Sequence, residues 1–143
     1  MKRGEAIRRR DCGQSLVEFA IVLPILLALL VGIFEFGVAW NRKQVLTNAA
    51  REGARRAILP SIATADTVDA VVDKYLTSAG IDPTSVARNY AGLCTGCTGD
   101  PITIQLQMTH TMPFVSAVSG LLDGGGGTPG SVTLTSVVNM RHE

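Results

Sequence analysis

The sequence predicts an α+β protein in which a long amino-terminal helix crosses a membrane and continues into a small head with a second helix and an antiparallel sheet. Three observations lead to this prediction. Residues 19–34 contain no charged side chain, and residues 67–79 repeat apolar side chains with a helical period. Two later segments alternate apolar and polar residues, as half-buried strands do. We therefore divide the chain into a leader (residues 1–13), a long helix (residues 14–59) and a head (residues 60–143).

The membrane segment is the most apolar part of the chain. Twelve of the sixteen residues in the range 19–34 are Leu, Ile, Val or Phe, and at about −0.3 to −0.6 kcal/mol each they favour insertion by about −5 kcal/mol. Sixteen helical residues span about 24 Å, slightly less than the hydrocarbon core, so the helix needs the residues up to Trp40 to cross it. We therefore predict a crossing at residues 19–40, with Trp40, Arg42 and Lys43 as an interfacial anchor.

Charge separates the leader from the rest of the chain. Residues 1–13 hold five basic and two acidic side chains, whereas the rest of the chain holds eight basic and ten acidic ones. The leader is polar and too short to fold alone. Because the sequence has no extended basic face, we do not predict nucleic acid as a partner. Residues 41–60 hold five further basic side chains, so charge alone leaves the membrane orientation undecided.

The junction between the leader and the apolar segment carries a recognisable motif. Gly13 is followed by Gln14, Glu18 is the fifth residue counted from Gln14, and Phe19 comes next. This arrangement resembles the processing site of type IV prepilins, in which a membrane aspartic peptidase cuts after the glycine on the cytoplasmic side. The similarity implies that Gly13, Gln14, Glu18 and Phe19 form a processing site.

A longer stretch narrows the resemblance. The run LVEFAIVLPILLALLVGIFEFG, followed by LTNAAREGARRA, resembles the TadE/TadG-like family of the tight-adherence (Tad, or Flp) pilus system over about the first sixty residues. The resemblance implies a pseudopilin (minor pilin) with a pilin-like fold, anchored in the bacterial inner membrane with its amino terminus cytoplasmic and its head extracytoplasmic. The implied partners are a prepilin peptidase, other pilin or pseudopilin subunits and a pilus assembly platform with its secretion ATPase.

Six residues of the long helix are candidates for helix packing and assembly: Glu18, Pro24, Glu35, Ala49, Gly53 and Ala57. The Glu18 carboxylate either pairs with the new amino terminus of a neighbouring subunit or extends into water as an ordinary flanking charge. Pro24 removes a helix donor, and Glu35 lies near the far edge of the crossing, where a charge costs less than at the midplane. The spacing of Ala49, Gly53 and Ala57 makes a face of small residues, which packs on the chain's own sheet or on sister helices.

The head is expected to contain a helix at residues 67–79, with Asp66 as its cap and Gly80 at its end. Strands are expected at about 102–112 and at 132–138, antiparallel to each other, and the weakly patterned segment 85–90 adds a third. The remaining segments are 113–122, a short helix or an apolar loop near the membrane surface, and 123–130, a flexible turn.

The cysteines fit this topology. Cys12 lies in the leader, so cleavage leaves only Cys94 and Cys97. In an oxidising compartment this pair most simply forms a local disulfide. The alternative, a redox site, lacks the thioredoxin context, because the pair precedes a strand rather than opening a helix. A zinc site needs two further ligands, and His110 and His142 lack the required spacing, so we expect no metal.

Motifs of catalysis are missing from the sequence, which contains no G-x-S-x-G, P-loop or H-E-x-x-H. We interpret Asp66, Asp69 and Asp73 as helix capping and a solvated face, and His110 as a structural residue of its strand. We therefore expect no enzyme activity, no cofactor and no small-molecule substrate.

Two alternatives to a cleaved pilin subunit remain open. One is an uncleaved single-pass protein that acts as a binding or thiol/redox protein. The other is a secreted domain cut after Ala39, because Gly37, Val38 and Ala39 make a small-x-small cleavage site. The apolar run is longer than a usual signal h-region and carries Glu35 before the cut, which argues against the secreted domain.

Overall fold

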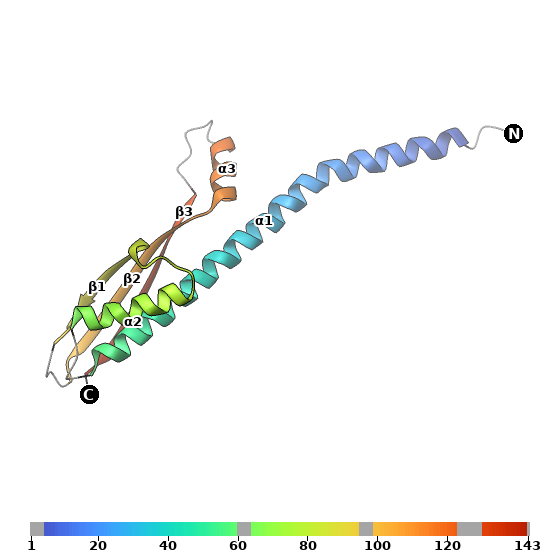
Figure 1. Ribbon diagram of the computed structural model, residues 1–143. Coiled ribbons are helices and arrows are strands. Elements are labelled where there is room, and N and C mark those ends of the chain that lie inside the picture. Colours follow the sequence, from blue (N-terminus) through green and yellow to red (C-terminus); the bar gives the residue numbers. More distant parts are fainter. Residues whose placement is uncertain (1–4, 60–63, 95–98, 123–129, 143) are drawn as a thin grey trace. The chain divides into compact units, whose positions relative to one another are not determined.

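Helix α1 spans Glu5–Ala57 in the computed structural model (Figure 1). The structure describes residues 5–59, 64–94, 99–122 and 130–142. The chain divides into two compact units, Met1–Phe36 and Gly37–Glu143, and we describe each by itself. The second unit contains the last part of α1 and the head.

The first unit confirms the long helix but corrects its beginning. We expected residues 1–13 to be too short to fold, whereas α1 already begins at Glu5 and continues through Gly13 and Pro24 without interruption. Adding residues to an existing helix is much easier than nucleating a new one, and no proline lies between Glu5 and Gly13. The leader residues therefore extend the helix that the apolar segment forms.

The second unit begins its independent structure with helix α2, Ala65–Ser78. The sequence suggested Asp66 as its cap, but the cap is Thr64. The Thr64 hydroxyl accepts a hydrogen bond from the Thr67 amide at 3.4 Å, and the Thr67 hydroxyl accepts one from the Thr64 amide at 3.3 Å. Asp66 lies in the first turn, where a negative charge is favourable at the positive end of the helix. The expected stop at Gly80 is confirmed by its φ of 73°.

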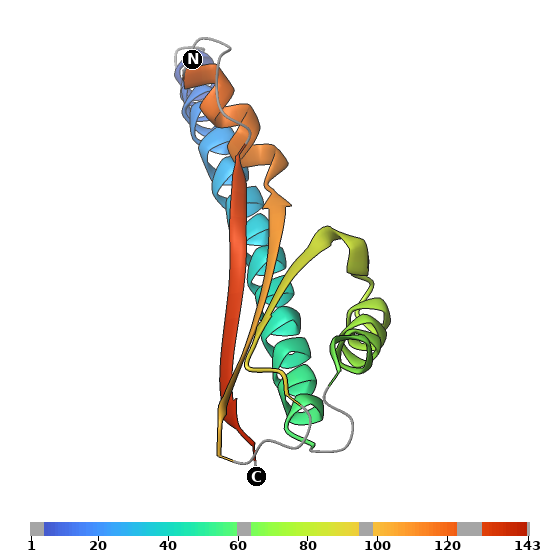
Figure 2. The ribbon, with the colours of Figure 1, turned by 90° about the vertical axis from the view of Figure 1, so that its left-hand side faces the viewer.

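A three-stranded antiparallel sheet completes the fold, with strand order β1-β2-β3. All three predicted strands are present: β1 is Val86–Ala91, β2 is Pro101–Thr111 and β3 is Ser131–Arg141. The short 3-10 helix η1, Pro83–Ser85, leads into β1. Helix α3, Pro113–Leu122, follows the end of β2 and precedes β3 in the chain (Figure 2). The helical interpretation of this segment is therefore correct.

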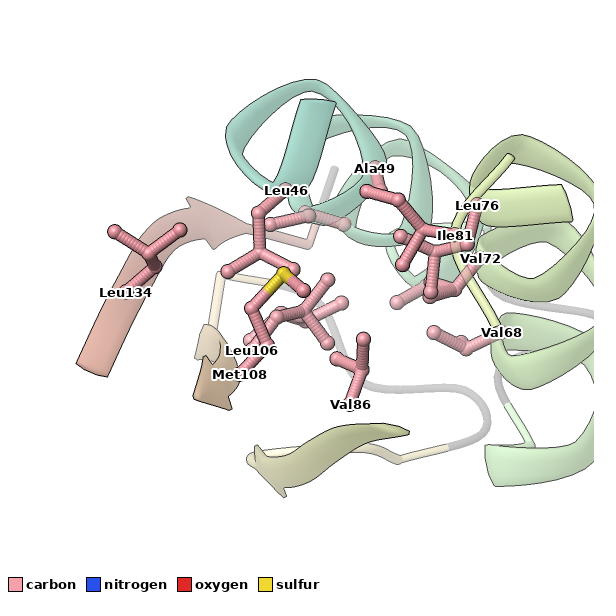
Figure 3. Close-up of a cluster of buried hydrophobic side chains, with 14 of the residues drawn as sticks. Leu46, Ala49, Val68, Val72, Leu76, Ile81, Val86, Leu106, Met108 and Leu134 are labelled. Atoms are coloured by element: carbon pink, nitrogen blue, oxygen red, sulfur yellow. The ribbon is translucent and has the colours of Figure 1, made fainter. Parts of the chain in front are cut away.

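The hydrophobic core lies between one face of this sheet and the two helices α1 and α2 (Figure 3). Alternate residues of β2 supply its centre: Ile102, Ile104 and Leu106 are fully buried, and Met108 is 4% exposed. Helix α2 adds Val68, Val72 and Leu76, which are the fully buried members of the predicted apolar stripe. The α+β class with a pilin-like layout is thereby confirmed.

Candidate functional site: helix α1

The predicted processing residues follow one another on α1. The Gln14 side-chain amide donates a hydrogen bond to Oε1 of Glu18 at 3.1 Å, one helical turn away. Gly13 has open space around it, because a Cβ built there meets nothing within 4 Å. Phe19 is 60% exposed. The Glu18 carboxylate thus lies one turn from the bond that the motif predicts to be cut.

Exposed apolar side chains begin within this motif and continue along α1 beyond it. Every Leu, Val, Ile and Phe of residues 16–36 is at least 36% exposed, and Phe34 reaches 73%. Pro24 lies within this stretch and leaves the helix continuous, while Glu35 near its end is partly buried. Among the described residues, the segment Gly13–Ala57 is the one helix long and apolar enough to cross a membrane.

The small-residue face of α1 lies inside the chain's own head. Ala49 and Ala57 are fully buried, and Gly53 is buried between them. A Cβ built on Gly53 would lie 2.9 Å from Val72 Cγ2 and 3.5 Å from Ile104 Cδ1. Of the two interpretations that the sequence left open, the structure supports the intramolecular one. These three residues let α1 approach α2 and β2 closely.

Helix α2 and strand β1 are joined by a polar cluster that we did not predict. The Arg88 guanidinium donates to Asp69 Oδ1 at 2.7 Å, and it also forms an ion pair with Asp73. It donates as well to the Pro83 carbonyl at 3.1 Å. The Tyr90 hydroxyl donates to Asp69 Oδ1 at 2.6 Å. The sequence suggested that Asp69 and Asp73 form a solvated face, but in the structure both pair with Arg88.

A signal for this cluster exists in the sequence. Asp69 and Asp73 are four residues apart and share one face of α2, while Arg88 and Tyr90 are two apart and share one face of β1. That the two faces meet depends on how α2 packs on the sheet, which spacing alone does not show. The cluster fastens the helix to the edge strand of the sheet.

Protonation of the cluster follows from its geometry. Burial alone would raise the pKa of Asp69, but the hydrogen bond from Tyr90 and the pairing with Arg88 outweigh it, so this pKa lies below its ordinary value of 3.8. Burial and the neighbouring Asp69 carboxylate raise the pKa of the Tyr90 phenol. The cluster therefore holds Asp69 charged and Tyr90 protonated over the physiological range.

Residues 13–55 match the family model described as TadE-like protein. This segment, called the TadE-like segment below, is similar to that family. The match begins at Gly13, includes Glu18, Pro24, Glu35 and Gly53, and ends two residues before the end of α1. The resemblance to the TadE/TadG-like family that we inferred from the sequence is confirmed over this range. No curated protein and no solved structure matches the chain.

Outside the TadE-like segment, the cysteine prediction stays a prediction, because Cys97 lies outside the described residues. His142 is 3% exposed, and its Nε2 lies 3.3 Å from the carbonyl oxygen of Gly92. Within the described ranges, no group of three or more His, Cys, Asp or Glu side chains is arranged to hold a metal ion. His142 thus belongs to the packing of the head.

We expect the Asp69→Asn chain to lose stability at neutral pH but not in acid. The pKa of Asp69 is lower in the folded state than in the unfolded state, so its contribution is present above 3.8 and disappears as the pH falls through the lower folded value. Because the Asp69 side chain is 36% exposed, we expect a loss of only about 1 kcal/mol at pH 7. Thermal unfolding of the head in detergent micelles across the pH range measures it.

Glu52→Gln is the control, because Glu52 is exposed on α1 and lies outside the cluster. Its unfolding should depend on pH as that of the unaltered chain does. A stability difference for Asp69→Asn that persists at the acid end would show that the charge of Asp69 does not hold α2 to β1.

Proposed function

We propose that this protein is a membrane-anchored pseudopilin, or minor pilin, for the assembly of Tad (Flp) pili. It is a non-enzymatic subunit that a prepilin peptidase processes after Gly13. The TadE-like match supports a pilus-related protein, and one apolar helix near the amino terminus fits a membrane anchor. The finer steps of processing, storage and assembly belong to this proposal.

The continuous exposure of apolar side chains along residues 16–36 carries the proposal. Soluble proteins rarely leave so large an apolar surface in water, because its transfer out of water is favourable. The helix therefore requires an apolar environment along this length. A bilayer provides it before assembly, and sister helices provide it within or beneath a filament.

Glu18 has a specific place in this mechanism. Cleavage after Gly13 creates a positive amino terminus at Gln14, one helical turn from the Glu18 carboxylate. A carboxylate at the membrane border is stabilised by pairing with such an amine. In the uncut chain the Gln14 side-chain amide donates a hydrogen bond of 3.1 Å to Oε1 of this carboxylate. Pairing with the amino terminus of a neighbouring subunit would couple processing to assembly.

In this proposal the leader lies in the cytoplasm, and the head is exported across the inner membrane. The prepilin motif and the placement of Cys94 and Cys97 in the head support this orientation. Partners are the prepilin peptidase, other pilin or pseudopilin subunits and the assembly platform.

The alternative of a secreted domain cut after Ala39 has less support. Ala39 lies inside the continuous helix α1 and is 4% exposed. A peptidase needs an accessible and locally extended bond, whereas this bond is helical and its alanine is covered. The structure adds nothing in favour of the thiol/redox alternative, since Cys97 lies outside the described residues.

The test is the mass of the full chain and of its amino-terminal peptide, measured after expression in bacterial membranes with and without a prepilin peptidase. We expect a chain that starts at Gln14 when the peptidase is present and at Met1 when it is absent. A chain that still starts at Met1 with an active peptidase contradicts processing. A start at Trp40 contradicts the membrane anchor and supports the secreted domain.

A further inference from the structure

The packing of β2 on α1 determines which residues of α1 lie beside the start of helix α3. Ile104 lies at the level of Gly53, 3.5 Å from its Cβ position. Met108, four residues further along β2, lies in the core beside Leu46 (Figure 3). Strand β2 therefore runs antiparallel to α1, so later residues of β2 lie beside earlier residues of α1.

Extending this geometry locates the end of β2. Thr111 lies three residues beyond Met108, about 10 Å at the rise of a strand. The same distance covers about seven residues of a helix, which leads from Leu46 back to Ala39. Helix α3 begins two residues after Thr111, at Pro113. It therefore starts level with Ala39 and Trp40, the predicted border of the membrane crossing.

Close packing against β3 holds α3 at this level. The Met112 amide donates to the Gly130 carbonyl at 2.6 Å, so the two ends of the connection meet. A Cβ built on Gly130 would lie 2.6 Å from the Ser116 amide nitrogen. The absence of a side chain at Gly130 is what allows the backbone of α3 to lie directly against the start of β3.

Helix α3 is uncharged and mostly apolar in sequence. Its sequence, PFVSAVSGLL, contains no ionisable residue, and Val115 and Val118 are 43% and 39% exposed. Val132 near the start of β3 is also 40% exposed, on the same face of the strand as Leu134. One turn of α3 and the start of β3 thus present valine side chains that the head does not cover.

We propose that α3 lies in the boundary between headgroups and acyl chains of the membrane that α1 crosses. This inference rests on the membrane anchoring in the proposed function and not on cleavage after Gly13. A bilayer is the proposed partner of this face because α3 starts beside Trp40, at the predicted border of the membrane crossing. Trp40 is followed by Arg42 and Lys43, a pattern typical of interfacial anchors. Because α3 has no charged side chain, its exposed valines can contact acyl chains without the cost of burying a charge.

A second membrane contact has a mechanical consequence. A single helix lets the head rotate about the helix axis, whereas α1 and α3 together hold the sheet in one orientation to the membrane surface. The contact is lost when the subunit leaves the bilayer, which frees the apolar face of α3 at that step.

The test uses tryptophan fluorescence, because Trp40 is the one tryptophan in the sequence. The full chain is reconstituted in vesicles of phosphatidylethanolamine and phosphatidylglycerol that carry bromine either near the headgroup end or near the methyl end of the acyl chain. The probe chain combines Trp40→Phe with Val118→Trp. We expect the headgroup-end bromine to quench it at least about twofold more strongly than the methyl-end bromine, as for an interfacial residue.

Asp66→Trp in the same Trp40→Phe background is the control. Asp66 is exposed, and it lies close in sequence to Val68, which packs near Gly53 and so far from α3. It carries the same interface-seeking side chain, and we expect no quenching there. Val115→Trp in this background gives an independent second probe on α3, and thermal unfolding confirms that each chain is folded.

The unaltered chain separates the two claims. Lack of quenching of Trp40 in it contradicts the membrane anchor itself. Quenching of Trp40 without quenching at either α3 position overturns the inference and leaves the exposed face of α3 to a protein partner. Equal quenching at Asp66→Trp and Val118→Trp also overturns it, because the bilayer would then not distinguish the two ends of the head.

Discussion

Chains that carry Gly13→Val are expected to keep residues 1–13 in the presence of an active prepilin peptidase. The proposed scissile bond follows a residue without a side chain, and a β-branched side chain there would hinder approach of the peptidase to the backbone. We expect the rate of processing to fall by about tenfold or more, which corresponds to about 1.4 kcal/mol of lost transition-state stabilisation. The ratio of full-length to processed chain in a mass spectrum, followed over time, measures this rate.

The structure makes this test specific. A Cβ at Gly13 meets nothing within 4 Å, and valine is a better helix former than glycine, so the change does not damage α1. Gly32→Val is the matched control, because Gly32 lies on the same helix and its Cβ also meets nothing. It should be processed at the normal rate. Normal processing of Gly13→Val would mean that the cut is made elsewhere.

Gly53→Leu is expected to unfold the head at much lower temperature. The Cβ alone would lie 2.9 Å from Val72 Cγ2 and 3.4 Å from Val68 Cγ1, and the rest of the leucine side chain would have to displace α2 or β2. Overpacking of a filled core costs about 1–3 kcal/mol and sometimes more. A loss of about 3 kcal/mol corresponds to a fall in Tm of about 15 °C for a domain of this size.

Gly37→Leu is the matched control for this prediction. Gly37 lies on the same helix, and a Cβ there meets nothing within 4 Å. Circular dichroism of the full chain in detergent micelles should show the head of this control unfolding at the normal temperature. Equal Tm values for the two leucine chains would show that α1 does not rest on α2 and β2 through Gly53.

The two glycine predictions divide the TadE-like helix into functional parts. Gly13 and Gly53 both belong to the matched range, 13–55, yet one lies in open space and the other in the core. Gly13→Val is expected to slow processing without lowering the stability of the head. Gly53→Leu is expected to lower the stability of the head without blocking processing. The burial of the small-residue face within the head supports its role in attaching the head to the helix.

Much of this protein was predictable from local sequence pattern. Uninterrupted apolar residues predicted the long apolar helix, and alternation predicted all three strands, because alternation reflects the two-residue period of a strand. The motif of Gly13, Gln14 and Glu18 could be recognised in the same way, since its residues lie within two turns of one helix.

Local pattern was less successful where two residue types compete for one role. Asp66 was the expected cap of α2, but Thr64 is the cap, because its hydroxyl exchanges hydrogen bonds with Thr67. Both residue types are good caps. Which of the two residues is the N-cap depends on the backbone conformation at the start of the helix, and the residue types alone do not reveal that conformation.

Sequence alone thus determined the long apolar helix, the α+β class and the candidate processing motif. Tertiary structure alone decided that Gly53 lies against Val72, and that Asp69 and Asp73 pair with Arg88. Periodicity states which residues share one face of an element, but not which faces meet. That choice is made when the whole core packs, because the apolar faces of α1, α2 and the sheet must be buried together.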